Sequence, residues 1–257
     1  MELSHHRAGS GDPVVLIHGV GSQWQVWEPV IEAVAREREV IALDLPGFGG
    51  SPTLPIGVVP GARALADAVA SFLDGLGIER PVLGGNSLGG WIALELAARG
   101  RAKSVVGVSP AGFATPWESA VARVNLNASA RAVRKMPELT EWLARRPRGR
   151  VLAFGGLVGS PARMPARAAI GASRNLARSP GFDATMAVIT RERFSRAAEV
   201  AVPVALLWGT RDYVLFPWQA RRALRELPRA RHVPLHGAGH VPMTDDPDAI
   251  VRELLAA

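Results

Sequence analysis

The sequence has no cysteine among its 257 residues, which excludes a disulfide framework and any metal site built on thiolates. It also lacks an apolar run of the roughly eighteen residues that a membrane-spanning helix needs. Residues 1–7 do not show the charged-then-apolar pattern of a secretory signal. We therefore predict a soluble, cytoplasmic protein without a membrane span.

Internal repeats and low-complexity tracts are absent as well. The chain is 48% apolar and 21% charged, which is typical of folded globular proteins and argues against disorder. At this length, one sizeable core built on an α/β sheet is expected.

Positive charge is concentrated in one segment. Residues 111–200 hold 15 Lys and Arg against 6 Asp and Glu, whereas the rest of the chain holds 15 basic and 17 acidic residues. An arginine-rich composition alone accounts for this excess, and the alternative is attraction of an anionic substrate or carrier. We predict no nucleic-acid partner.

Short β-type runs alternate with helix-type stretches, a pattern typical of a mostly parallel sheet with helices on both faces. The expected strands are 14–17, 40–43, 81–84, 104–108, 202–207 and 231–234. The expected helices are 24–35, 63–76, 88–98, 218–227 and 247–255.

The alternation stops between residues 111 and 200, where helical stretches are separated by prolines and no strand is evident. We predict that this segment is an inserted helical cap, or lid. Residues 1–110 and 201–257 would then form the core domain.

The candidate nucleophile is Ser87, in Gly85-Asn86-Ser87-Leu88-Gly89. This is the G-x-S-x-G pattern, in which a serine occupies a sharp turn between a strand and a helix. The expected strand 81–84 and helix 88–98 supply that setting. The glycines admit a strained backbone, whereas a serine that only caps a helix does not require them.

A serine hydroxyl needs a base and a group that orients the base. His240 lies in a glycine-rich loop between the last strand and the last helix, where its side chain can reach the end of the sheet. His236, four residues earlier, is the nearest rival. The two histidines lack the helical setting and third ligand of a metal site, so no metal is predicted. His232 falls within a strand and is expected to be structural.

Asp212 is the candidate acid because it follows the strand 202–207. Asp245 and Asp246 are alternatives, but their position predicts that they cap the final helix. The resulting order along the chain is Ser87, Asp212, His240, which agrees with a G-x-S-x-G nucleophile followed by its acid and then its base. The backbone N–H groups of Leu88 and Val20 are expected to form an oxyanion hole, and His18 is expected to support the loop that carries Val20.

Taken together, five motifs resemble those of the α/β-hydrolase superfamily over nearly the whole chain. They are His18-Gly19-Val20-Gly21, Asp44 to Ser51, Gly85 to Gly90, Trp208 to Asp212 and Gly237 to His240. The resemblance implies an α/β fold with a central sheet of about eight mostly parallel strands, flanked by helices and carrying an inserted cap. It also implies that the Asp44 loop is architectural and that no cofactor is used.

The expected activity is cleavage of a carboxylic ester or related acyl substrate by a carboxylesterase-like serine hydrolase. Two alternatives stay open: hydrolysis of a carbon–carbon bond in ring-cleavage diketones, and a receptor-like role with slow turnover. The resemblance to carbon–carbon hydrolases is local, in Gly-Asn-Ser-x-Gly-Gly. Dehalogenases and epoxide hydrolases of the superfamily use an aspartate nucleophile, so Ser87 disfavours those activities.

Overall fold

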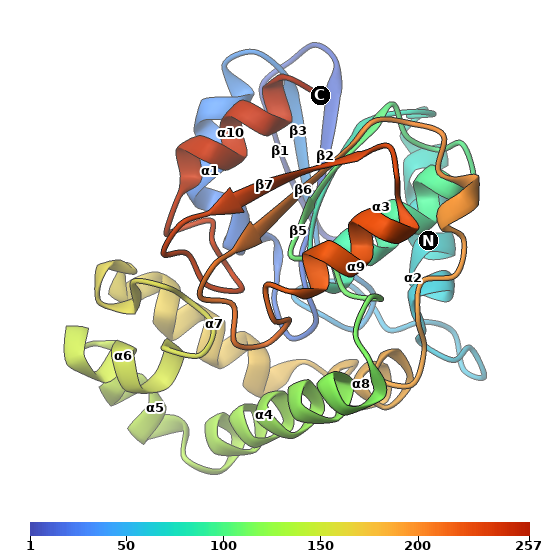
Figure 1. Ribbon diagram of the computed structural model, residues 1–257. Helices are drawn as coiled ribbons and strands as arrows, with labels where there is room; N and C mark the ends of the chain where they lie inside the picture. Colours follow the sequence, from blue (N-terminus) through green and yellow to red (C-terminus); the bar gives the residue numbers. More distant parts are fainter.

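The computed structural model describes residues 1–257 and is centred on a seven-stranded sheet in the order β1-β3-β2-β4-β5-β6-β7 (Figure 1). All neighbouring strands are parallel except β1, which pairs antiparallel with β3 at one edge. The strands are β1 (His5–Ala8), β2 (Pro13–Ile17), β3 (Glu39–Leu43), β4 (Val82–Asn86), β5 (Ser104–Val108), β6 (Val204–Gly209) and β7 (Ala230–Leu235).

The expected α/β-hydrolase architecture is thus present, but with seven strands in place of about eight. The six strands expected from apolar runs are β2 to β7. The strand that was not expected, β1, has the sequence His-His-Arg-Ala and alternates between exposed and half-buried residues. Its pairing with β3 comes from backbone hydrogen bonds, which leave no apolar signal in the sequence.

Alternate residues of the strands supply two separate apolar layers. In β2, Val15 and Ile17 face a cluster that includes α2 (Ala62–Gly75), α3 (Leu88–Ala98) and α9 (Gln219–Glu226). Val14 and Leu16 face the other cluster, with the 3-10 turn η1 (Trp24–Trp27), α1 (Glu28–Ala35) and α10 (Pro247–Leu255). Because successive strand residues point to opposite faces, near-continuous apolar strands favour a sheet covered on both sides.

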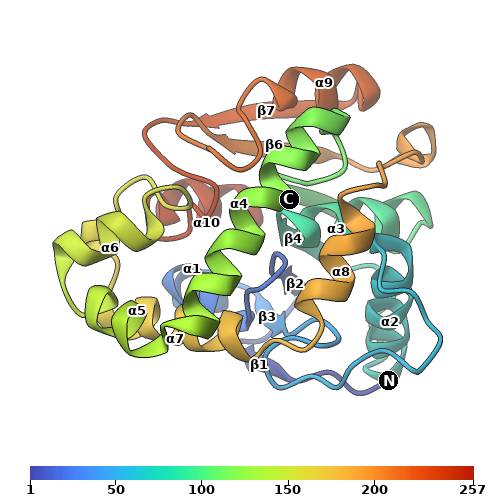
Figure 2. The same ribbon diagram turned by 90° about the horizontal axis from the view of Figure 1, so that it is seen from below.

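Between β5 and β6 the chain forms helices and no strand. These are α4 (Pro116–Lys135), α5 (Pro137–Ala144), α6 (Pro147–Phe154), α7 (Ala166–Arg178) and α8 (Phe182–Ile189), with short 3-10 turns η2 (Pro161–Arg163) and η3 (Ala197–Glu199). The inserted helices form a layer below the core in Figure 1, and α4 and α8 cross in front of the strands in Figure 2. None of the helices combines the length and apolar character needed to cross a bilayer.

A buried carboxylate fixes the start of this insertion to the core. Glu118, in the first turn of α4, accepts hydrogen bonds from the Thr115 backbone at 2.6 Å, from Arg222 of α9 at 2.9 Å and from the Trp218 indole at 2.6 Å. Burial raises the pKa of Glu118, but these hydrogen bonds outweigh it, so the pKa lies below the ordinary value. The charge therefore stays on Glu118 and holds α4 against α9.

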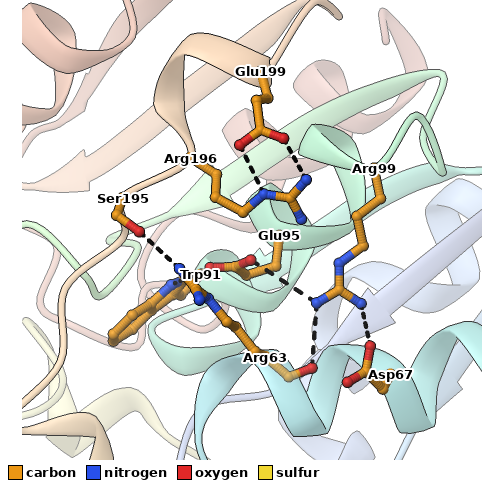
Figure 3. A network of polar contacts seen from close by, with 8 residues as sticks. All are labelled: Arg63, Asp67, Trp91, Glu95, Arg99, Ser195, Arg196 and Glu199. Atoms are coloured by element: carbon orange, nitrogen blue, oxygen red, sulfur yellow. Dashed lines mark hydrogen bonds and ion pairs between the residues drawn. The ribbon is translucent and has the colours of Figure 1, made fainter.

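A second polar network holds residues 195–199, where the chain leaves the inserted helices and leads back to β6 (Figure 3). The buried Glu95 of α3 accepts a hydrogen bond from the Trp91 indole at 3.2 Å and lies 4.0 Å from the Arg99 guanidinium. Arg63 of α2 donates to Ser195 at 2.8 Å, and Arg196 is paired with Glu199 in η3. The end of the insertion is thus anchored beside α2 and α3.

Candidate active site

The sequence-predicted site residues all follow the carboxyl ends of parallel strands. Ser87 comes directly after β4, Asp212 three residues after β6, and His240 five residues after β7. Val20 follows β2. In an open parallel sheet these ends share one edge, which is where ligands bind in such folds.

Ser87 occupies a strained turn. Its backbone has φ 55° and ψ −116°, a left-handed conformation that non-glycine residues rarely adopt and that costs about 1–3 kcal/mol. The Ser87 N–H donates to the Val108 carbonyl at 2.9 Å, and the Ser87 carbonyl accepts from Ala111 at 2.9 Å and from Trp91. These bonds to the β5 end and to α3 hold the turn in place.

Neighbouring glycines make the turn possible because backbones meet there. A Cβ atom on Gly85 would lie 2.3 Å from the Gly89 carbonyl oxygen, and one on Gly89 would lie 2.1 Å from the Ile17 carbonyl oxygen. Both distances are far inside van der Waals contact. The G-x-S-x-G spacing is therefore a packing requirement of the strand–turn–helix geometry.

Asp212 and His240 are in direct contact. His240 Nδ1–H donates to Asp212 Oδ2 at 2.8 Å, and both side chains are buried. The other oxygen, Asp212 Oδ1, accepts from the backbone N–H groups of Val214 at 2.9 Å and Leu215 at 2.8 Å. The two backbone hydrogen bonds fix the Asp212 carboxylate. The bond from His240 Nδ1–H selects the tautomer of His240, whose Nε2 has no hydrogen bond inside the chain. His236, the nearest rival, is exposed, and so is His232, which was expected to be structural.

Asn86 has a role that the sequence reasoning missed. Its buried side-chain amide donates to the Val108 carbonyl at 3.1 Å and to the His240 carbonyl at 3.0 Å. The residue next to Ser87 thus holds the loop that carries His240. The motif position x in G-x-S-x-G gave no hint of this, because the partner is 154 residues away.

The prediction that both Asp245 and Asp246 cap the last helix is half wrong. Asp246 is the N-cap of α10 and accepts from the Ala249 N–H. The Asp245 carboxylate instead accepts from Gly159 at 2.7 Å, Ser160 at 2.8 Å and Gly239 at 2.9 Å. It joins the inserted helices to the His240 loop, because two of its donors come from the turn after α6.

Two backbone N–H groups beside Ser87 are unpaired. Neither the Val20 nor the Leu88 N–H has a hydrogen-bond partner in the chain. Leu88 begins α3, where the helix leaves its first donors free. Gly19 brings the Val20 loop close, since a Cβ atom on Gly19 would lie 3.1 Å from Ser87 Cβ.

His18 orients the Val20 N–H. Its Nδ1–H donates to the Gly19 carbonyl at 2.7 Å, and its Nε2 accepts from the Leu45 N–H at 2.9 Å. Because the carbonyl of Gly19 and the N–H of Val20 belong to one peptide plane and point in opposite directions, holding one aims the other. Burial keeps the pKa of His18 below 6.5, against the opposite effects of the Gly19 carbonyl and Asp44. His18 is therefore a neutral support.

A small cavity of about 50 Å³ lies against Ser87. Its only charged lining residue is Glu192, and no lysine or arginine contributes to it. The 15 cations of residues 111–200 therefore do not surround this cavity. Its wall comes from the loops after the strands and from α4 and α8: Val20, Ala111, Gly112, Ala114, Ser119, Ala122, Leu126, Met186, Ile189, Thr190, Val214 and Leu215.

A larger surface groove of about 450 Å³ lies between β1 and α1. Its lining includes His6, Trp24, Glu28 and Arg36 but no nucleophile with a base beside it. Size alone therefore does not identify the reactive site.

Fold and site together define a hydrolase with a serine at the strand–helix turn. The chain belongs to the alpha/beta hydrolase family, whose model matches residues 14–253. It is 34% identical over 198 residues to the epoxide hydrolase EphH of Mycobacterium tuberculosis, covering 74% of this chain and 92% of that protein.

Two further similarities extend the comparison. The chain is 39% identical over 102 residues to 2-hydroxy-6-oxo-2,4-heptadienoate hydrolase of Pseudomonas putida, a match spanning 38% of this chain and 37% of that protein. Among solved structures, a thermophilic esterase from Thermogutta terrifontis superposes with a TM-score of 0.78 at 25% identity, covering 99% of this chain and 92% of the esterase.

Proposed function

We propose that this hydrolase cleaves uncharged carboxylic esters with a short acyl group, through an acyl-enzyme on Ser87. The observation that carries the proposal is the Asp212–His240 hydrogen bond beside a strained serine with two unpaired N–H groups. Residues 111–200 act in this proposal as the cap that closes the substrate cavity.

In the first half-reaction, His240 Nε2 takes the proton of the Ser87 hydroxyl while the serine oxygen attacks the ester carbonyl. The negative charge formed on the carbonyl oxygen is stabilised by the N–H groups of Val20 and Leu88. Collapse of this intermediate expels the alcohol, which takes the proton from His240. Asp212 holds the imidazole in place and stabilises its positive charge.

In the second half-reaction, His240 takes a proton from water, and the hydroxide formed attacks the acyl carbonyl. The carboxylic acid leaves when the Ser87 oxygen regains its proton. An epoxide does not fit this cycle, because serine attack on an epoxide carbon would form an ether that has no carbonyl for water to attack. The name of the mycobacterial relative therefore does not transfer to this chain.

Carbon–carbon hydrolysis is the second candidate, favoured by the similarity to the heptadienoate hydrolase. A substrate of that kind carries a carboxylate, and the cavity beside Ser87 offers no cation to bind one, while Glu192 would repel it. Ester cleavage fits the cavity better.

The test compares two serines of the same cavity. Ser87→Ala should lower the turnover of 4-nitrophenyl acetate by about 10⁵–10⁶-fold, as expected when the nucleophile of a triad is lost. Ser119→Ala, from α4, should change turnover less than about threefold, because Ser119 only lines the cavity. Retained activity in a folded Ser87→Ala protein would refute the mechanism.

A further inference from the structure

The outer inserted helices carry an exposed apolar stripe that the catalytic cavity does not use. Leu139 and Trp142 lie three residues apart on one side of α5, and Met136, the residue that caps this helix, precedes them by a further three. The side of α6 that faces solvent adds Val151 and Leu152. Trp142 is 51% and Leu152 80% exposed. We call these five residues the α5–α6 face.

Unpaired cations adjoin the α5–α6 face. Lys135, Arg146 and Arg148 are exposed and take part in no ion pair, while Arg146 stacks over the Trp142 ring at 4.0 Å. The acid Glu141 does not neutralise them, because Arg174 already binds both its oxygens at 2.6 and 2.8 Å. Glu138 is the one exposed acid on α5.

Exposed apolar side chains also occur on α4, at Trp117 and Val124, but the α5–α6 face gathers five of them on two helices in contact with each other. Figure 2 shows α5 and α6 at the outer end of the inserted helices, away from the α4 and α8 segments that line the cavity. Lys135, Arg146 and Arg148 therefore belong to the excess positive charge of residues 111–200 but do not line the cavity beside Ser87. Single exposed apolar side chains are common, but a group of several on adjoining elements is typical of an interaction surface.

We propose that the α5–α6 face binds a membrane surface rich in anionic lipid. A tryptophan and aliphatic side chains beside unpaired cations match what such a surface offers, namely an apolar layer beneath negative headgroups. The arginine and lysine stems extend to the headgroups while the apolar tips enter the layer. An acidic protein would satisfy the cations but not five exposed apolar side chains, and a second copy of this basic chain would be repelled.

The experiment is sedimentation of the 257-residue protein with vesicles of phosphatidylcholine alone or mixed with phosphatidylglycerol, at low and high salt. Wild type should bind the mixed vesicles, and the binding should weaken with salt. The triple variant Lys135→Gln, Arg146→Gln, Arg148→Gln should lose about a hundredfold in partition coefficient. Trp142→Ala with Leu152→Ser should also weaken binding, and turnover of a soluble ester should stay as in wild type.

The matched control removes Arg221, Arg225 and Arg229, three exposed and unpaired arginines of α9 and the turn after it. Changing all three to Gln should leave vesicle binding within about threefold of wild type. Absence of binding to mixed vesicles at low salt would overturn the proposal. Equal loss in the control triple would do so too, as would light scattering that shows a dimer dispersed by Leu152→Ser without any vesicle binding.

Discussion

At the scale of single residues, the candidate site depends on three buried groups that fix the residues proposed to react. Asp212 holds the His240 ring, Asn86 holds the His240 carbonyl, and His18 aims the Val20 N–H. None of these contacts involves a flexible side chain in solvent. Preorganisation of this kind reduces the reorganisation needed when charge develops on the substrate.

The neutral state of His18 should appear in the pH dependence of stability. Its pKa in the folded protein lies below 6.5, so below that pH the unfolded chain binds a proton that the folded chain does not. The free energy of unfolding should therefore fall as the pH drops below about 6.5, by up to about 1.4 kcal/mol per pH unit from this group.

Urea unfolding of wild type and His18→Gln between pH 5 and 8 measures this contribution. The variant should show a shallower slope below pH 6.5, and the exposed His236→Gln should keep the slope of wild type. Identical slopes for wild type and His18→Gln would mean that His18 is not held neutral.

At the scale of elements, the His240 loop is held by hydrogen bonds to the segment that follows α6. Asp245 links Gly239 to Gly159 and Ser160, so the turn after α6 and the His240 loop share one carboxylate. The close approach is built into the backbone: a Cβ atom on Gly159 would lie 2.0 Å from the Gly237 carbonyl oxygen.

Asp245→Ala should therefore affect both stability and rate. Three N–H groups lose a charged acceptor, at a cost of about 2–4 kcal/mol, and a displaced His240 should lower kcat about ten- to a hundredfold. Asp246→Ala removes the α10 cap, and should cost about 1 kcal/mol with kcat unchanged. Chemical denaturation and ester kinetics on both variants make the comparison. Equal kcat for the two would exclude a positioning role for Asp245.

Local patterns in the sequence predicted most of the elements, because apolar strands and strand–turn–helix motifs are encoded by neighbouring residues. The regions near Ser87, Asp212 and His240 were placed correctly relative to the strands for that reason. What could not be predicted depends on partners distant in the chain. Asp245 looks like a helix cap until Gly159 is brought beside it, and β1 has no apolar pattern of its own.

At the scale of the whole molecule, the sheet carries the candidate site at one edge, and the helices between β5 and β6 form part of the cavity wall beside it. The sequence could not tell which residues between 111 and 200 face Ser87. Apart from Glu192, those residues are apolar or small, and the cavity is about 50 Å³, so the fold limits the acyl group mainly by its size.

Acyl length should therefore control the rate. From 4-nitrophenyl acetate to the octanoate, kcat/KM should fall about ten- to a hundredfold, since added methylenes overfill a packed site. Met186→Ala, which enlarges the cavity wall, should restore activity on the longer ester, whereas the exposed Met136→Ala should not. A rate that rises steadily with acyl length in wild type would contradict the assigned cavity.

The central claim is that Ser87 becomes acylated during turnover. Wild-type protein mixed with 4-nitrophenyl acetate, quenched in acid within the first turnover and digested should give a peptide carrying one acetyl group on Ser87. Ser87→Ala, treated in the same way, should give none. An acetyl group on another residue, or turnover with no acylated intermediate when release of the acid is rate-limiting, would contradict the mechanism.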